Sequence, residues 1–191
     1  MIDIVVPRPI AWVSTCDRQG RDNLAPFSYF TAVSSDPACI MFSISSKRGG
    51  VPKDTLNNIK QTQQFVVNTV PRNLEQSMVN TSREFDTGVS EFTECRVESS
   101  PSNWVKPPRV AGCCSALECR LFDLLPIKNE KGRTSTTMVI GRVLGVYFNP
   151  EFYDAELNPL ERCQPVARLG KRNYLTWGKV YKMQSETPSL D

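Results

Sequence analysis

Apolar residues recur along the chain in short runs rich in β-branched and aromatic side chains, and several of these runs alternate with polar residues. A period of two places one face of a strand in a core and leaves the other face in water. The runs that fit this pattern are residues 10–15, 39–46, 65–70, 115–125 and 136–148. We therefore expect a mainly β protein.

One shorter segment, residues 54–62, instead shows the spacing of a helix. Leu56 and Ile59 lie on the same face of this segment. Asp54 stands at its start, where its carboxylate can cap the free amide groups of the first turn. The pattern predicts a short helix that packs one side against a sheet.

A second short helix is predicted over residues 73–82. Leu74 and Met78 lie one turn apart, so both can cover the wall of a barrel. Asn73 and Gln76 have the spacing of a capping box, in which two side chains satisfy the free amides of the first turn. Together they favour a helix that begins near Asn73.

The sequence also indicates where the first turn lies and how many domains the chain has. Residues 17–20 have the chemistry of a hairpin turn, and Gly20 can supply a positive φ. A β-hairpin is therefore expected to begin the barrel. A chain of 191 residues is about one to one and a half typical domains long. We interpret residues 1–184 as a single domain and residues 185–191 as a polar C-terminal tail.

The composition is close to that of an average globular protein, with 40% hydrophobic and 23% charged residues. The net charge of +3 is spread along the chain, so no nucleic-acid partner is expected. No stretch approaches the roughly 18 apolar residues of a spanning helix. The first residues also lack the pattern of a signal peptide. We expect a cytoplasmic protein that does not interact with membranes.

The sequence contains no histidine. This absence excludes Ser-His and Cys-His nucleophile pairs and His-ligated metal sites, so we expect no metal. Any chemistry is expected to reside in a bound cofactor. The seven cysteines lack the CxxC spacing of zinc or redox sites, and reduced thiols are expected. Cys113 and Cys114 are interpreted as buried small hydrophobes.

A series of motifs runs through nearly the whole chain in a characteristic order. It comprises PRPIAWVST at 7–15, NLAPFSYF at 23–30, KDTLNNI at 53–59, FVVN at 65–68 and RLG at 168–170. This ordered series closely resembles the flavin-reductase-like family of FMN-binding proteins, which includes the flavoredoxins. At 170–172 the chain reads Gly-Lys-Arg where relatives often have Gly-Gly, which changes the expected rim of the cofactor site.

The resemblance implies a fold, a cofactor and a partner. The fold would be an FMN-binding split barrel, an antiparallel barrel of Greek-key type with short helices. The cofactor would be non-covalent FMN, with NADH or NADPH as electron donor. The partner would be a second copy of the chain, because the resemblance implies a homodimer that holds the flavin near its interface.

The resemblance also suggests which residues bind the phosphate of FMN. A phosphate site needs amide donors, hydroxyl groups and usually a cation. Lys53, Asp54 and Thr55 stand at the predicted helix start, where amides and a positive dipole end are available. Ser43 and Ser45 share one face of the preceding strand and can add hydroxyls. The alternative is that Asp54 only caps the helix and the serines are solvated.

The run 23–28 suits the flavin ring. Backbone donors at the polar edge of the ring favour its reduced state. Pro26 fixes the backbone, and Ala25 permits close approach. The Asn23 side chain and the amides of Phe27 and Ser28 can then face the ring edge. In the alternative, the aromatic residues of this run belong to the core or to a dimer interface.

Further residues are assigned by their position in the motifs. Ser14 and Thr15, at the end of the first strand, can face the ribityl chain. Tyr174, with Trp177 nearby, can cover the ring, although interface packing explains these aromatics equally well. Arg8 lies between two prolines and can meet a carboxylate or the flavin, with a surface salt bridge as the alternative.

The sequence thus leads to one main hypothesis and two others. The main hypothesis is an NAD(P)H-dependent flavin reductase, in which hydride passes to N5 of the flavin and no side chain acts as a nucleophile. The second is a non-catalytic FMN protein that receives electrons from a protein partner. The third is a small barrel that binds oligonucleotides, and the modest charge argues against it.

Overall fold

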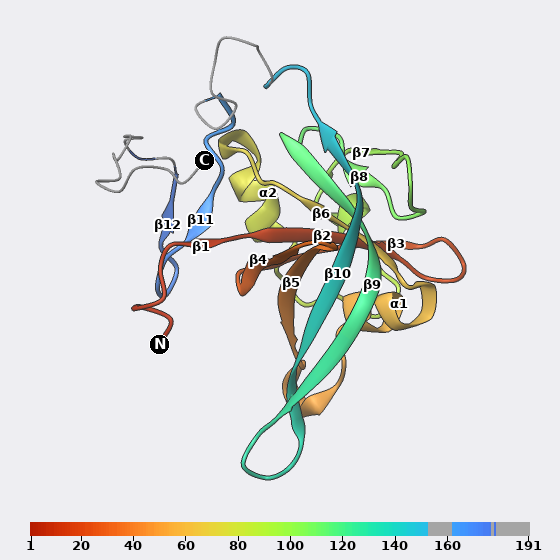
Figure 1. Ribbon diagram of the computed structural model, residues 1–191, viewed down its shortest axis with the longest axis vertical. Coiled ribbons are helices and arrows are strands. Elements are labelled where there is room, and N and C mark those ends of the chain that lie inside the picture. Colours follow the sequence, from red (N-terminus) through yellow and green to blue (C-terminus); the bar gives the residue numbers. More distant parts are fainter. Residues whose placement is uncertain (153–161, 177, 179–191) are drawn as a thin grey trace, which may run out of the picture.

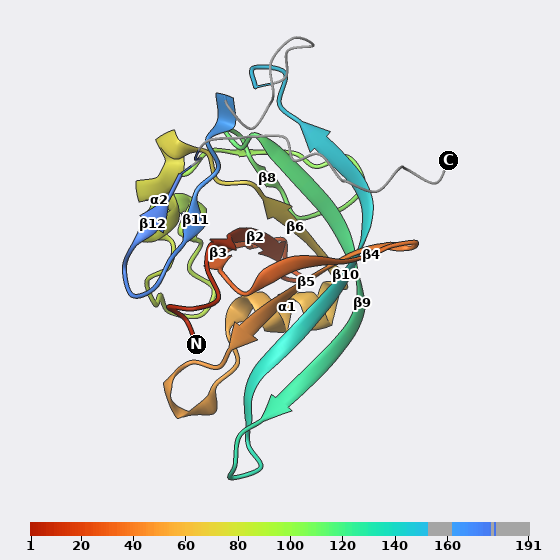
Figure 2. The ribbon, with the colours of Figure 1, turned by 60° about the vertical axis from the view of Figure 1, so that its left-hand side comes forward.

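The computed structural model describes residues 1–152, 162–176 and 178 of the chain. A seven-stranded antiparallel sheet forms the body, with the strand order β3-β2-β6-β9-β10-β5-β4 (Figure 1). These strands are β2 (Ala11–Cys16), β3 (Asp22–Phe27), β4 (Phe30–Ser35), β5 (Ala38–Ser45), β6 (Gln64–Asn68), β9 (Ser115–Lys128) and β10 (Thr134–Phe148). Strands β9 and β10 extend past the body as a long hairpin, which both views show (Figures 1 and 2).

The two smaller sheets lie at the margins of the barrel. One joins β1 (Arg8–Pro9), β11 (Ala167–Arg168) and β12 (Tyr174–Leu175), so that segments from both ends of the chain pair with each other. The other joins β7 (Ser99–Ser100) and β8 (Arg109–Val110). The first sheet places the hairpin of β11 and β12 beside a short helix that follows β6, as Figure 2 shows.

The helices are short. They are η1 (Arg48–Gly50), α1 (Asp54–Thr62), η2 (Arg72–Leu74), α2 (Glu75–Asn80) and α3 (Glu91–Glu94). Helix α1 has the predicted bounds and packs on β2, β3 and β6. The prediction that Asp54 caps it is wrong, because the extended residue Lys53 is the N-cap and Asp54 is already helical. The Asp54 carboxylate instead lies 3.5 Å from the Lys47 ammonium.

The second predicted helix is shorter than expected. Its first turn is the 3₁₀ segment η2, and the α-helix begins only at Glu75. The capping box predicted for Asn73 and Gln76 is wrong, since no side chain caps the start of α2. The helix ends at Asn80 because the Thr81 hydroxyl donates to the Met78 carbonyl, a local bond that competes with further helical turns.

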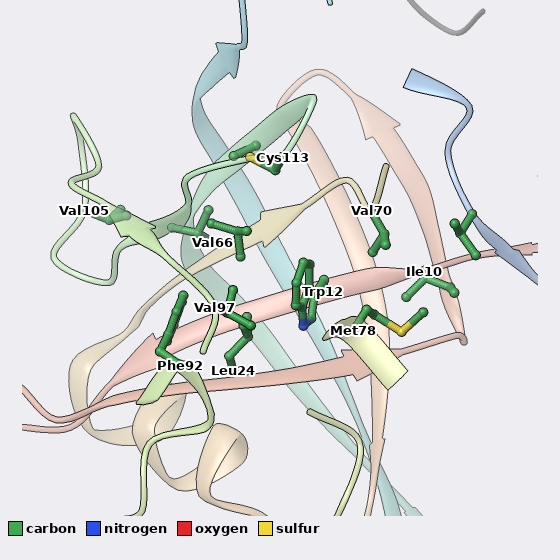
Figure 3. Packing of buried hydrophobic residues seen from close by; sticks show 13 residues of the cluster. Ile10, Trp12, Leu24, Val66, Val70, Met78, Phe92, Val97, Val105 and Cys113 are labelled. Atoms are coloured by element: carbon green, nitrogen blue, oxygen red, sulfur yellow. The ribbon is translucent and has the colours of Figure 1, made fainter. Parts of the chain in front are cut away.

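The core has two parts, on opposite faces of the sheet. Strand β2 is buried along its whole length because it separates them. Trp12 projects into the first cluster, where Leu24, Val66 and Met78 surround it (Figure 3). Val13 projects into the second cluster, which also contains Phe42 and Phe65. The Trp12 indole donates to the Thr81 hydroxyl at 2.9 Å and so fixes the chain that follows α2.

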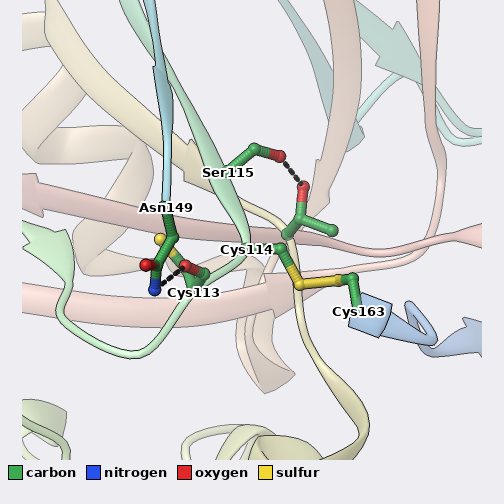
Figure 4. The surroundings of a disulfide bond; sticks show 6 residues. Cys113, Cys114, Ser115, Asn149 and Cys163 are labelled. Atoms are coloured by element: carbon green, nitrogen blue, oxygen red, sulfur yellow. Dashed lines mark hydrogen bonds between the residues drawn. A yellow bond between two sulfur atoms is a disulfide. The ribbon is translucent and has the colours of Figure 1, made fainter. Parts of the chain in front are cut away.

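One disulfide corrects the expectation of reduced thiols. Cys114, at the start of β9, is joined to Cys163, with 5.9 Å between their Cα atoms (Figure 4). This separation is in the normal range for a disulfide. The two residues lie 49 positions apart, so no local spacing indicated their pairing. Cys113 is a buried free thiol, as expected, and burial raises its pKa to about 12.

The mainly β barrel with short helices is confirmed, as is the initial hairpin, which β2 and β3 form. None of the helices in the described residues is long and apolar enough to cross a membrane. The proposed tail, residues 185–191, and Trp177 lie outside the described residues.

Candidate functional site

A pocket of about 130 Å³ lies where the N-terminus of α1 meets the edge strand β3. Residues 81–85, which follow α2, and Glu91 close its other side. The pocket brings together six of the residues predicted to bind the cofactor. They are Asn23, Ala25, Pro26, Lys53, Asp54 and Thr55.

The start of α1 gives this pocket its donors. The first backbone bonds of the helix are donated by the amides of Leu56 and Asn57 to the Lys53 carbonyl. The amides of Asp54 and Thr55 precede this ladder and are free of helical partners. They lie at the positive end of the helix dipole, and an anion is the ligand that such a terminus prefers.

Two buried side chains shape the floor of the pocket. Asn23 on β3 donates through Nδ2 to the Thr55 hydroxyl at 3.0 Å, and both residues are almost fully buried. The Thr55 hydroxyl accepts this bond and can donate its own proton into the pocket. The hydrogen bond therefore holds a strand and a helix start together and orients a hydroxyl donor.

The charged residues of the pocket are three cations and three acids, and two of the acids already have partners. Asp54 faces Lys47. Glu91 accepts from the Leu24 amide at 2.8 Å, and burial raises the pKa of its carboxyl. Lys53, whose ammonium lies 6.0 Å from the centre of the Phe27 ring, and Arg83 supply positive charge at the rim.

Seven of the predicted residues do not line this pocket, and Ser14 and Thr15 are two of them. Ser14 is fully buried, donates to the Pro108 carbonyl and accepts from Asn68. Thr15 is also fully buried and accepts from Asn58 at 3.1 Å. These interior hydrogen bonds hold the barrel wall together, and a contact of either hydroxyl with the ribityl chain stays a prediction.

The two serines of β5 lie elsewhere because their strand pairs with β10. Ser43 is opposite Met138, and Ser45 is opposite Thr136, with 3.3 Å between the two hydroxyl oxygens of the latter pair. The pocket is lined by β3 and α1 and not by β5. Neither serine lines the pocket that holds Lys53, and their part in binding FMN stays a prediction.

The remaining predicted residues have other surroundings. Phe27 is buried against Phe42, with ring centroids 5.3 Å apart, which is the core packing given as its alternative. Ser28 follows directly after β3 and is half-buried. Tyr174 lines a separate, larger cavity between α2 and the hairpin of β11 and β12.

Arg8 has neither of the roles expected for it. Its side chain is buried and donates to the carbonyls of Ile2, Val5 and Leu169. Each bond goes to the backbone, so Arg8 joins the first residues of the chain to the C-terminal hairpin. No local pattern indicates the contact with Leu169, which lies 161 positions away.

Several residues of the pocket were missed. Lys47 comes from the loop before η1, and Thr81, Ser82 and Arg83 come from the chain after α2. Tertiary contacts bring these residues to the pocket, the bond from Trp12 to Thr81 among them. The one local signal was the Gly49-Gly50 pair, both with positive φ, which marks an irregular loop between β5 and α1.

Known proteins are similar to this chain in sequence and in fold. The model of the family described as "Flavin reductase like domain" matches residues 4–162. An uncharacterized protein of Aquifex aeolicus (strain VF5) is 34% identical over 176 residues, which cover 92% of this chain and 87% of the relative.

Two solved structures are similar over nearly the full length. Nitrilotriacetate monooxygenase component B from Bacillus cereus has a TM-score of 0.88 and 26% identity, covering 95% of this chain and 90% of that one. The 2-nitrobenzoate 2-nitroreductase of Pseudomonas fluorescens has a TM-score of 0.83 and 29% identity, covering 100% and 91%.

Proposed function

Because the chain belongs to the flavin reductase-like family, we propose that it is an oxidoreductase that binds FMN and holds the cofactor's phosphate in the pocket at the start of α1. Membership of this family supports a flavin-related oxidoreductase role. The proposal goes further in two respects: the flavin is FMN, and the electron donor is NADH or NADPH.

The observation that carries the proposal is the donor set around the helix start. Free amides of Asp54 and Thr55, the Thr55 hydroxyl and the Lys53 ammonium converge on one small pocket. A phosphate takes these donors, since it accepts several hydrogen bonds and carries nearly two negative charges. A volume of about 130 Å³ suits a phosphate with the neighbouring carbons and not a whole flavin, so the ring would extend outside the pocket.

The protein's own part in the reaction would be to bind and orient. Bound FMN supplies the hydride-accepting chemistry, so no side chain has to act as a nucleophile. Lys53 and the helix start would fix the phosphate end, and Asn23 would hold β3 against α1 so that the site keeps its shape. Such positioning is how a protein brings two reacting rings to attack distance.

A comparison of two flavins tests the phosphate pocket. Apoprotein titrated with FMN and with riboflavin, followed by quenching of flavin fluorescence, should prefer FMN. Lys53→Gln should weaken FMN binding by about tenfold, because a charge-assisted contact is lost, and should leave riboflavin binding almost unchanged. Lys60→Gln, the same change at the other end of α1, is the matched control. Equal affinity of the wild-type protein for the two flavins would contradict the proposal.

The electron donor is tested separately by rapid mixing. Holoprotein mixed with NADH or NADPH under anaerobic conditions should lose the visible absorbance of oxidised flavin within the time of a turnover. A holoprotein that keeps its colour with both nucleotides would show that electrons come from another donor.

A further inference from the structure

A second cavity, of about 700 Å³, lies between α2 and the C-terminal hairpin of β11 and β12. These two elements lie side by side in Figures 1 and 2. Four arginines line the cavity, against one acid, Glu75. They are Arg72, Arg83, Arg168 and Arg172. We call this cavity the arginine groove.

Some of these arginines are held in place by contacts within the groove. The Arg168 guanidinium lies 4.5 Å from the centre of the Tyr174 ring and donates to the Tyr174 hydroxyl and the Lys171 carbonyl. Arg72 is 3.4 Å from Glu75 at the other wall. Guanidinium groups that are already ordered lose less entropy when they bind an anion.

The walls between the arginines suit a flat, partly apolar molecule. Val79 on α2 and Tyr174 and Leu175 on β12 contribute apolar surface. A planar guanidinium matches the oxygens of a phosphate with two parallel hydrogen bonds. Phosphate groups joined to a ring system are therefore the ligand chemistry that the groove fits, and its volume is large enough for a nucleotide.

The groove adjoins the pocket at the start of α1. Ser82 and Arg83 line both cavities, so a ligand in the groove would lie next to the proposed FMN phosphate. Arg172 follows Gly170 and Lys171 in the turn between β11 and β12, so two positive residues stand next to each other there.

We propose that the arginine groove binds the phosphate-bearing adenosine half of the nicotinamide dinucleotide that reduces the flavin. The inference rests on the proposed function for its choice of dinucleotide, and the groove itself can be tested without turnover. Because the groove presents an excess of arginines, the protein should prefer NADPH, with its additional phosphate, to NADH.

The test uses a ligand that carries no reducing equivalents. Adenosine 2′,5′-bisphosphate titrated calorimetrically into the full-length, FMN-saturated protein should bind saturably, and more weakly as salt is added. Adenosine alone and inorganic phosphate alone should bind far less, which separates a nucleotide site from a simple anion site. The double variant Arg72→Gln/Arg172→Gln should bind the bisphosphate at least about tenfold more weakly. The double variant Arg18→Gln/Arg133→Gln, at exposed positions outside the groove, removes the same net charge and is the control.

Kinetics supply a second readout. The double variant should raise the KM for NADPH with little change in kcat, since the groove contacts the part of the donor that does not react. Unchanged bisphosphate affinity in the double variant would overturn the inference, as would exclusion of the bisphosphate by bound FMN. If the bisphosphate binds but NADPH does not bleach the flavin, the groove is a nucleotide site and NADPH is not the electron donor.

Discussion

At the scale of single residues, Glu91 connects the pocket to the fold. Its carboxylate accepts from the Leu24 amide on the free edge of β3, and so it joins α3 to the strand that forms one wall of the pocket. Burial raises the pKa of this carboxyl, with only partial opposition from the hydrogen bond. A buried carboxyl of this kind costs stability when it ionises.

The variant Glu91→Gln should reveal this cost as a function of pH. At a pH below the pKa of this carboxyl in the unfolded chain, Glu91 is neutral in the folded and the unfolded state. Its contribution to the free energy of unfolding is then fully present. As pH rises through its higher folded pKa, ionisation lowers the stability of the wild type, whereas glutamine does not titrate. The free energy of unfolding of the wild type minus that of the variant should therefore fall as pH rises above the ordinary pKa of a glutamate carboxyl, about 4.

Chemical denaturation of both proteins at several pH values measures this difference. A difference that stays constant with pH would show that Glu91 titrates alike in the folded and unfolded states.

The sequence predicted those pocket residues whose positions follow from local structure. Lys53 and Thr55 follow from the start of α1, which Leu56 and Ile59 fix through their shared buried face. Lys47 and Arg83 could not be predicted in this way, because they belong to irregular segments that only the folded barrel brings together.

At the scale of elements, the disulfide ties the C-terminal hairpin to the barrel. Cys163 precedes β11 by a few residues, and Cys114 directly precedes the long strand β9. Closing a loop of this length restricts the unfolded chain, and the loop-entropy model gives about 4 kcal/mol for it as an upper value. The hairpin that this bond retains carries Arg168 and Tyr174 of the arginine groove.

The variant Cys163→Ser should accordingly lower the free energy of unfolding by up to about 4 kcal/mol, because the unfolded chain regains its freedom. Guanidinium denaturation measures the effect, and wild-type protein treated with reductant should match the variant. Cys95→Ser, at a free and half-buried cysteine, should change stability little. Identical denaturation of reduced and untreated wild type would contradict a stabilising disulfide.

Helices and strands could be predicted from the sequence where their apolar residues recur with a regular period. The long hairpin of β9 and β10 and helix α1 were found because each has a regular period. Strand β4 was missed, since all but one of its residues are exposed and show no alternation. Helix α2 was predicted too long because the bond from the Thr81 hydroxyl to the Met78 carbonyl, at which it ends, does not show in the apolar pattern.

At the scale of the whole molecule, the hairpin of β9 and β10 has exposed apolar surface. It carries the exposed residues Phe122, Leu125, Ile127, Leu144 and Val146. A group of large exposed apolar residues usually marks a contact surface. We propose that a second copy of this chain covers it, as the family resemblance led us to expect.

Replacing Val146 by lysine tests this proposal, because a charge within an apolar contact must be buried without a partner. Sedimentation velocity should show a dimer for the wild type and a shift to monomer for Val146→Lys. Ile4→Lys, at an exposed apolar position near the N-terminus, should remain dimeric. A wild-type protein that sediments as a monomer at all concentrations would contradict the proposal.

The hydrogen bond from Trp12 to Thr81 has a practical consequence. The indole is fully buried, and its only polar atom is joined to a residue that lines the cofactor pocket. Indole emission is sensitive to the polarity and the hydrogen bonding around the ring, so filling or emptying the pocket should change the ultraviolet fluorescence of this tryptophan. The molecule therefore contains its own optical probe of occupancy, which needs neither a dye nor a coloured ligand.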